Sequence, residues 1–184
     1  MSGAARDPEE SLKQPQAIGA EFFERPAARV ARDLIGAQLV RRLDQRILSF
    51  RITETEAYEG VHDLASHSSR GRTARNEVMF GPAGHFYIYR IYGLHWMLNV
   101  VTGKLGEAAA VLIRGVEGIS GPGRVALALG IEASLRGMPA SPASGLWFGY
   151  PEQNDKPKIK RTPRIGVDYA GPIWANKKLR FVRI

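Results

Sequence analysis

The sequence predicts an α+β fold in a single domain, built on a mixed, mainly antiparallel sheet with a few helices. Short segments with strand-type alternation recur between turn signals, whereas only two or three segments have helical spacing. The length of 184 residues is enough for one sizeable core and short for two. We therefore expect one domain over residues 20–184. Residues 1–19 are mostly polar or small and contain two prolines, so we expect a disordered arm there.

The first elements follow from the pattern before residue 60. A helix is predicted ahead of Gly36, because Val30 and Leu34 lie one turn apart and glycine commonly ends a helix. Residues 38–42 are predicted to form a short strand. Residues 46–58 are predicted to be its long antiparallel partner across a tight turn.

A long polar connection at residues 59–82 comes next, and a connection of that length is usually functional or disordered. Residues 86–91 and 94–101 are then predicted to form a hairpin that turns at Tyr92 and Gly93. An exposed tyrosine at a hairpin tip buries nothing in its own domain and so suggests a partner. The alternative is that Tyr92 folds back on its own sheet.

The remaining segments complete the sheet. Residues 108–116 are apolar on both faces except Arg114, which predicts a central strand. The turn at residues 120–123 opens a short helix that ends at Gly130. Its N-terminus, with Arg124 close by, could hold a phosphate, and a simple turn explains it equally well. Further strands are predicted at residues 146–148, 164–167 and 179–184, and a loop rich in proline and lysine is predicted at residues 150–163.

Two carboxylates stand out at the end of the strand at residues 46–58. Glu54, Glu56 and Tyr58 are predicted to share a face with the apolar residues before them, because strand side chains repeat every two positions. Carboxylates on a core-facing side are costly unless they are paired or in use, and Arg114 needs such a partner. A buried carboxylate that an arginine keeps ionised is suited to act as a general base. The alternative is a structural ion pair, and position alone leaves Glu54 as the rival of Glu56.

The charge balance favours a polyanionic partner. Net charge is +8 and the pI is about 10. The basic residues form groups at residues 70–75, 156–164 and 177–183. Nucleic acid is the commonest partner of such chains, whereas the alternative is that the excess only aids solubility.

Composition also narrows the compartment and the chemistry. The chain has no cysteine, which excludes disulfides and cysteine-ligated metal centres. The acidic and histidine residues near residues 54–67 follow no recognised ligand spacing, so no metal and no cofactor are expected. No apolar run is long enough to span a membrane, and the N-terminus lacks the pattern of a signal peptide. We expect an intracellular monomer without membrane contact, in the cytoplasm or nucleoid if the source is bacterial.

Several motifs occur in an order that resembles the alkyladenine (3-methyladenine) DNA glycosylase family. They extend from residue 22 to the C-terminus, and the ordered set is more specific than any one motif. The motifs are Glu54-Thr55-Glu56-Ala57-Tyr58, His67-Ser68, Arg75-Asn76, Met79-Phe80, Tyr87-Ile88-Tyr89-Arg90-Ile91-Tyr92-Gly93, Asn99, Leu112-Ile113-Arg114, Gly121-Pro122-Gly123, Arg164-Ile165-Gly166-Val167-Asp168-Tyr169-Ala170-Gly171 and Leu179-Arg180-Phe181.

This resemblance implies a monofunctional DNA glycosylase on a curved sheet with a protruding hairpin that intercalates into DNA. Its partner would be double-stranded DNA that contains damaged purines of the 3-methyladenine, 7-methylguanine, hypoxanthine and ethenoadenine class. The enzyme would flip the nucleotide out of the duplex, because the glycosidic bond cannot be reached inside the stack. The motif contains no lysine that could form a Schiff base, so strand cleavage is not expected.

The resemblance also implies roles for individual residues. Glu56 would activate the water that attacks the sugar, with Arg114 beside it. Rings stack well on flat bases and better on cationic ones, which suits the extruded purine. The implied base pocket contains Tyr58, His67, Tyr89, Asn99, Leu112 and Ile165. Tyr92 and Leu94 would intercalate, and Arg72, Arg75 and Arg124 would contact the DNA backbone.

Two alternatives belong to other classes of protein. A non-catalytic basic module would bind nucleic acid without releasing bases. A metal-dependent hydrolase would lose activity with a chelator.

Overall fold

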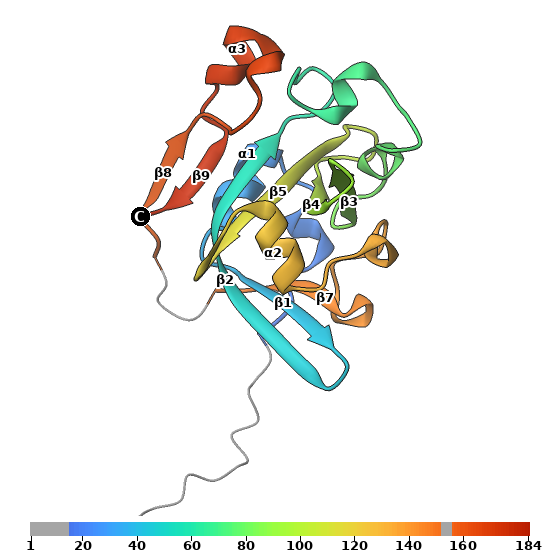
Figure 1. The fold of residues 1–184 in the computed structure, drawn as a ribbon, viewed down its shortest axis with the longest axis vertical. Coiled ribbons are helices and arrows are strands. Elements are labelled where there is room, and N and C mark those ends of the chain that lie inside the picture. Colours follow the sequence, from blue (N-terminus) through green and yellow to red (C-terminus); the bar gives the residue numbers. More distant parts are fainter. Residues whose placement is uncertain (1–14, 152–155) are drawn as a thin grey trace, which may run out of the picture.

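The long strand β2 (Arg46–Tyr58) lies at the centre of the sheet in the computed structural model, which describes residues 15–151 and 156–184. Over these residues the sheet has nine strands, with the order β3-β4-β5-β2-β1-β7 along its main path (Figure 1). The pairings between its strands are antiparallel. The predicted α+β class with a mainly antiparallel sheet is therefore confirmed.

The other elements have the following bounds. The strands are β1 (Gln38–Leu43), β3 (Phe86–Ile91), β4 (His95–Thr102), β5 (Ala109–Val116), β6 (Ile119–Ser120), β7 (Leu146–Gly149), β8 (Ile159–Thr162) and β9 (Arg180–Arg183). The α-helices are α1 (Ala27–Asp33), α2 (Pro122–Ala128) and α3 (Gly171–Asn176). None of the helices in the described ranges is long and apolar enough to cross a membrane.

Two neighbours share one edge of β2. β1 pairs with its first half, from Arg46 to Arg51, and β9 pairs with Glu54 to Glu56 further along. β5 pairs along the opposite edge. The end of β2 is thus flanked by β5 and β9, and its residues from Glu54 to Ala57 are buried.

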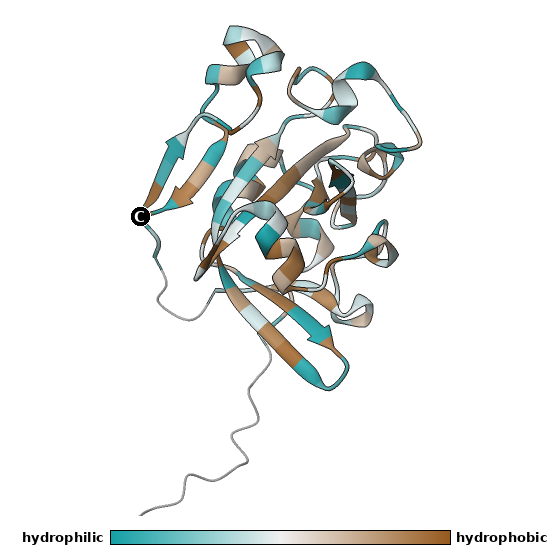
Figure 2. Cartoon of the chain, in the orientation of Figure 1, coloured by the Kyte–Doolittle hydropathy of each residue, from teal (hydrophilic) through white to brown (hydrophobic). Residues whose placement is uncertain are grey.

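The main core lies on one face of this sheet. α1 and α2 both pack there, through residues such as Val30 and Val125. From β5, Val111 and Ile113 join this core, whereas Leu112 and Arg114 point to the opposite face and line a cavity. Apolar residues therefore follow one another along β5, while the β1–β2 hairpin alternates between apolar and polar residues (Figure 2).

A β-bulge in β2 changes which of its residues face the core. The pairing with β5 shifts register between Ile52 and Glu54 and again between Glu54 and Thr55. Ile52 and Ala57 both belong to the main core although they are separated by an odd number of positions, so the alternation changes phase between them. The expectation that Glu54, Glu56 and Tyr58 share the face of Ile52 is therefore wrong. The three lie on the opposite face, because the alternation of side chains changes phase at this irregularity.

Gly115 accommodates this bulge. It pairs with Glu54, and a Cβ at this position would lie 3.1 Å from the Glu54 Cβ and 3.3 Å from the Thr53 hydroxyl oxygen. Such a contact is tighter than packed side chains normally allow, so the close approach of the two strands depends on a glycine.

One other expectation about local structure differs from the fold. Residues 164–167 were expected to form a strand, but they are irregular, and the strand is β8 within the expected loop at residues 150–163. The disordered arm expected at residues 1–19 lies outside the described residues as far as residue 14. Ile18 is buried, and its N–H donates to the carbonyl of Phe148 at 2.8 Å.

The turn between β3 and β4 has an unusual backbone. Tyr92 and Gly93 both have positive φ, 51° and 66°, and the Leu94 N–H donates to the Ile91 carbonyl at 3.0 Å. Positive φ at both central residues is the type I′ pattern, which matches the twist of a tight hairpin. A tyrosine in this conformation is strained, and such strain is concentrated at functional sites.

Candidate active site

A cavity of about 470 Å³ opens on the face of the sheet opposite the main core. Its wall is formed by β3, β4, β5, the connection at residues 59–82 and the segment at residues 165–169. Among the residues that the sequence singles out, the cavity brings together Tyr58, His67, Arg75, Tyr89, Tyr92, Asn99, Leu112, Arg114 and Ile165. Arg72, Leu94 and Arg124 lie outside its wall, as does Glu56.

Aromatic rings form one side of the cavity. The ring of His67 lies edge-on to Tyr89, with centroids 4.6 Å apart, and its Nδ1 shares a hydrogen bond of 2.8 Å with the Tyr87 hydroxyl. Burial, and then the charge of Arg75, lower the pKa of His67, so the imidazole is neutral at pH 7. Burial also raises the pKa of Tyr58 and Tyr89, which keeps both hydroxyls protonated. The result is an uncharged aromatic slot.

Glu56 lies directly behind this slot, and its side chain has no exposed surface. Its Oε2 accepts a hydrogen bond of 3.0 Å from the Tyr58 hydroxyl, and its Oε1 accepts one of 2.8 Å from the Ile165 N–H. Arg114 Nε is 3.6 Å from the same Oε1. All three of these neighbours line the cavity, so Glu56 is one layer beneath its wall.

Opposing effects act on the Glu56 carboxyl group. Burial raises its pKa, because the charged form loses hydration. The charge of Arg114 and the hydrogen bonds from Ile165 and Tyr58 act against this rise. The carboxyl group therefore has a pKa above the ordinary range while every neighbouring donor favours its ionised form. That combination is typical of a proton acceptor at a functional site.

Glu54 has a different environment from Glu56. Its Oε1 accepts from Arg114 Nε at 3.0 Å and also forms an ion pair with Arg180 Nε. Glu54 therefore holds Arg114 in place between the two glutamates. The expected pairing of Arg114 with these carboxylates is confirmed, and Arg180 is a further partner that the sequence did not indicate.

Asn99 forms part of the cavity floor. Its Nδ2 donates to the carbonyls of Tyr87, at 3.1 Å, and Met97, at 3.4 Å. Asn99 is opposite Tyr87 on β3 and opposite Leu112 on β5, so both neighbouring strands fix its position. With the amide nitrogen engaged by the backbone, the Asn99 side chain has a fixed orientation beside the cavity.

The hairpin tip stands at the cavity mouth. Tyr92 is 89% exposed and lines the cavity, and Leu94 is 76% exposed beside it. The alternative in which Tyr92 folds back on its own sheet is therefore wrong. His95, the first residue of β4, packs against Gly123 of α2, where a Cβ would meet the ring at 3.2 Å. α2 thus supports the base of the turn.

The three arginines expected at the DNA backbone are all exposed. Arg75 donates to the Arg90 carbonyl at 3.2 Å, and its guanidinium lies 5.2 Å from the centre of the Tyr89 ring. Arg72 pairs with Glu77 at 2.8 Å on the surface, an arrangement that stabilises a fold only slightly. Arg75 therefore belongs to the cavity rim, while Arg72 and Arg124 lie further from it.

Sequence reasoning missed several residues of the site. Tyr87, which would otherwise be taken for core, lines the cavity and bonds to His67. Tyr169 also lines it, and its hydroxyl donates to the Ala65 carbonyl at 2.9 Å. Alternation with Tyr89 could have indicated Tyr87, whereas no local pattern indicates Tyr169. Within the described ranges no group of three or more acidic or histidine side chains could hold a metal ion.

The chain is similar to known proteins along most of its length. A model of the methylpurine-DNA glycosylase (MPG) family matches residues 21–120 and 118–183. A protein of Myxococcus xanthus is 47% identical over 170 residues, which cover 86% of each chain. A protein of Methanocella arvoryzae is 44% identical over 82% of this chain and 84% of its own. A third, from Legionella pneumophila, is 44% identical over 87% and 90%. Each of the three is named "Putative 3-methyladenine DNA glycosylase". The resemblance is thereby confirmed, and the chain belongs to the methylpurine-DNA glycosylase family.

Proposed function

We propose that this DNA glycosylase excises alkylated and related damaged purines from duplex DNA by hydrolysing the bond between the base and C1′. The observation that carries the proposal is the pairing of an uncharged aromatic slot with a buried carboxylate directly behind it. The slot suits a flat purine ring, and the carboxylate suits a proton acceptor. Neither feature alone would distinguish this site from a structural cluster.

The proposed reaction assigns one step to each group. A water molecule attacks C1′, the C1′–N bond breaks, and its electron pair leaves with the base. Glu56 accepts the proton that the water loses, while Arg114 holds the carboxylate from 3.6 Å and is itself held by Glu54. A cationic base such as 3-methyladenine departs neutral, so its departure needs no proton from the protein.

The base must leave the helix to enter the slot, and the hairpin suits the task of replacing it. Tyr92 would occupy the gap in the stack, with Leu94 beside it. The exposure of both side chains and the positive φ of Tyr92 support this assignment. An exposed aromatic residue held in a strained turn does nothing for the stability of its own domain.

The pocket would select among purines by stacking and by shape. Tyr58, His67 and Tyr89 would contact the two faces and edge of the base. Asn99 would crowd the position where guanine carries its exocyclic amino group, supported by the fixed orientation of its side chain. Leu112 and Ile165 would complete the apolar wall.

The basic residues would hold the phosphates of the flanking duplex. Arg75 at the cavity rim would contact the strand that carries the lesion, while Arg72 and Arg124 would contact phosphates further away. The net charge of +8 favours such contacts. Arg72 can exchange Glu77 for a phosphate at small cost, because their ion pair is exposed.

The experiment that tests the proposal is incubation of the protein with methylated duplex DNA in the presence of EDTA. We expect release of free 3-methyladenine and 7-methylguanine and formation of abasic sites without strand cleavage. Binding without release would instead favour the non-catalytic module. Release that EDTA abolishes would favour the metal-dependent hydrolase.

A further inference from the structure

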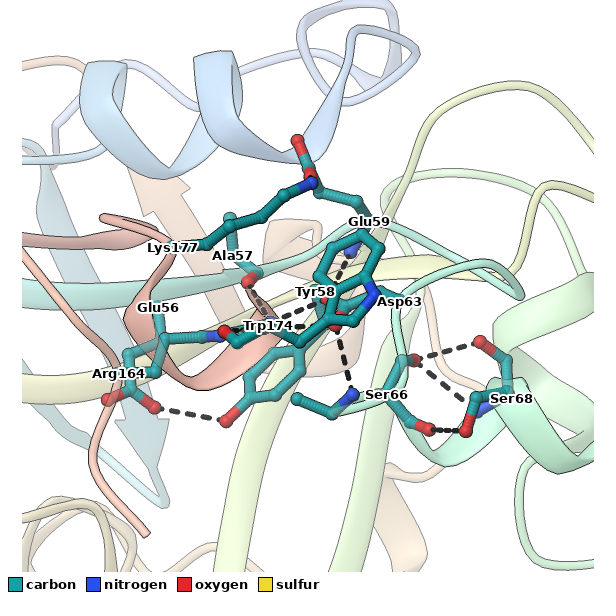
Figure 3. A network of polar contacts seen from close by, with 12 residues as sticks. Glu56, Ala57, Tyr58, Glu59, Asp63, Ser66, Ser68, Arg164, Trp174 and Lys177 are labelled. Carbon is teal, nitrogen blue, oxygen red and sulfur yellow. Dashed lines mark hydrogen bonds and ion pairs between the residues drawn. The ribbon is translucent and has the colours of Figure 1, made fainter. Parts of the chain in front are cut away.

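Asp63 and Arg164 form an ion pair beside the cavity, and neither side chain has any exposed surface. Arg164 donates through both terminal nitrogens to both oxygens of Asp63. The same carboxylate also accepts from the backbone N–H groups of Glu59 and Ala65, each at 3.0 Å. Asp63 is therefore saturated with donors, and it fixes the guanidinium in one orientation (Figure 3).

This ion pair connects to both hydrogen bonds that hold Glu56. The residue after Arg164 is Ile165, whose N–H donates to Glu56 Oε1 at 2.8 Å. The Arg164 guanidinium lies 4.8 Å from the centre of the Tyr58 ring, and the Tyr58 hydroxyl donates to Glu56 Oε2 at 3.0 Å. Arg164 also donates, at 2.8 Å, to the carbonyl of Ala57, the residue between Glu56 and Tyr58 in β2. The guanidinium thus contacts the strand that carries Tyr58, and Arg164 itself belongs to the segment that supplies the Ile165 N–H.

Arg164 acts from behind the cavity wall. Tyr58 and Ile165 line the cavity, whereas Arg164 and Asp63 do not. Arg164 would therefore touch neither the base nor the sugar, and its effect on the reaction would pass through its neighbours.

We infer that Arg164, clamped by Asp63, is a positioning residue that aims the Glu56 carboxylate and the Tyr58 ring at the bound nucleotide. The inference rests on the proposed function, because it presupposes that Glu56 accepts a proton during hydrolysis. A buried ion pair is seldom needed for stability alone, since apolar residues of similar size often serve as well. The pair is better explained by the two donors that it holds around one carboxylate.

The inference predicts a change in pH dependence, because both donors favour the ionised form of Glu56. Other charged or titratable groups also face this carboxylate from the surrounding elements. They are Glu54 on β2, Arg114 on β5, Tyr89 on β3, and Arg164 and Tyr169 on the segment at residues 164–169. All of these groups except Arg164 itself remain when Arg164 is replaced and the two hydrogen bonds loosen, so burial then dominates and the pKa of Glu56 rises further. Excision, which needs the carboxylate, would be lost at a higher pH than in the wild type.

The test compares Arg164→Gln with Arg41→Gln under single-turnover conditions on duplex DNA containing 7-methylguanine. Arg41 is a matched control: it too is a buried arginine, and it donates to the carbonyls of Leu129 and Gly145, away from the cavity. We expect Arg164→Gln to slow excision about 10- to 100-fold, the scale of a small misplacement of reacting groups. Its acid limb should move to higher pH, with unchanged affinity for DNA. Arg41→Gln should lower thermal stability and leave both the rate and the acid limb unchanged.

The outcome separates a positioning role from a structural one. A folded Arg164→Gln variant whose acid limb coincides with that of the wild type overturns the inference, whatever its rate. If this variant does not fold, the acid limb of Asp63→Asn is measured instead and is expected to move in the same way. This substitution keeps the shape of the Asp63 side chain and removes the charge that holds Arg164. Failure of the proposed function would look different: the wild type would release no base, or Glu56→Gln would excise normally.

Discussion

The turn at the hairpin tip allows one prediction in which stability and activity change in opposite directions. Tyr92 has a φ of 51°, and the following Gly93 has one of 66°. The left-handed region costs an ordinary residue about 1–2 kcal/mol, whereas asparagine tolerates it. Asn-Gly is also the preferred pair in a type I′ turn. Tyr92→Asn should therefore stabilise the free protein by about 1 kcal/mol, which raises Tm by about 2–4 °C for a domain of this size.

The same substitution should damage excision from duplex DNA. The side chain of Tyr92 is 89% exposed, so nearly all of its surface is available to a partner. An aromatic side chain buries about 150–250 Å². At about 25 cal/mol per Å², that area corresponds to about 4–6 kcal/mol of favourable transfer. Ordering the side chain and the DNA consumes part of this. If half of this free energy remains, removing the tyrosine should raise the activation barrier by about 2–3 kcal/mol, which slows excision roughly 30- to 160-fold.

The assay pairs thermal unfolding with single-turnover excision of hypoxanthine from duplex and single-stranded oligonucleotides. The single strand has little stack to replace, so Tyr92→Asn should change its excision only a few-fold. Tyr92→Ala is the control: it should lose duplex activity to a similar extent without the rise in Tm. Equal losses on both substrates would refute the intercalating role. An unchanged or lower Tm in Tyr92→Asn would refute the argument from backbone strain.

Four further predictions concern the carboxylate, its pH dependence, the charge and the pocket. Glu56→Gln should reduce excision by at least ~10²-fold while lesion binding survives. Glu54→Gln should excise faster than Glu56→Gln if Glu56 is the general base. Because burial raises the pKa of Glu56, wild-type excision should fall on acidification at a higher pH than an ordinary glutamate would give, as a rate–pH profile would show. Replacing Arg72 and Arg75 with alanine should make the log–log salt dependence of duplex binding shallower by about 0.9 for each phosphate that is no longer neutralised, and an unchanged slope would remove both from the interface. Asn99→Ser should raise the excision of 7-methylguanine relative to hypoxanthine by about 10- to 200-fold, and a constant ratio of single-turnover rates would mean that the guanine gate lies elsewhere.

The strands that carry the site were predictable because their alternation is local. The bounds of β2 and β3 follow from strand-type residues and flanking turn signals that can be read without knowing any partner. β8 escaped prediction because three of its four residues are polar, and only its pairing with β9 makes it a strand. The bulge in β2 could not be foreseen either, since an extra residue is defined relative to the neighbouring strand.

The site shows the same limit. Tyr89 and Asn99 belong to neighbouring strands, β3 and β4, that are close in sequence, and both line the cavity. Asp63 and Arg164 are separated by 101 positions, and nothing near either residue specifies the other. Such a pair exists only once the whole sheet has formed, so no pattern within one segment could indicate it.

The bulge in β2 also has a consequence for how this protein can change over time. Thr55 and Ala57 serve the packing of the domain, while Glu54, Glu56 and Tyr58 lie on the cavity side, where the proposed function assigns them to the reaction. Neighbouring codons therefore experience different selection, one set for a stable interior and the other for a substrate. A single-residue insertion or deletion between the bulge and Tyr58 would exchange the two sets at once, so we expect length variation among relatives to avoid this stretch.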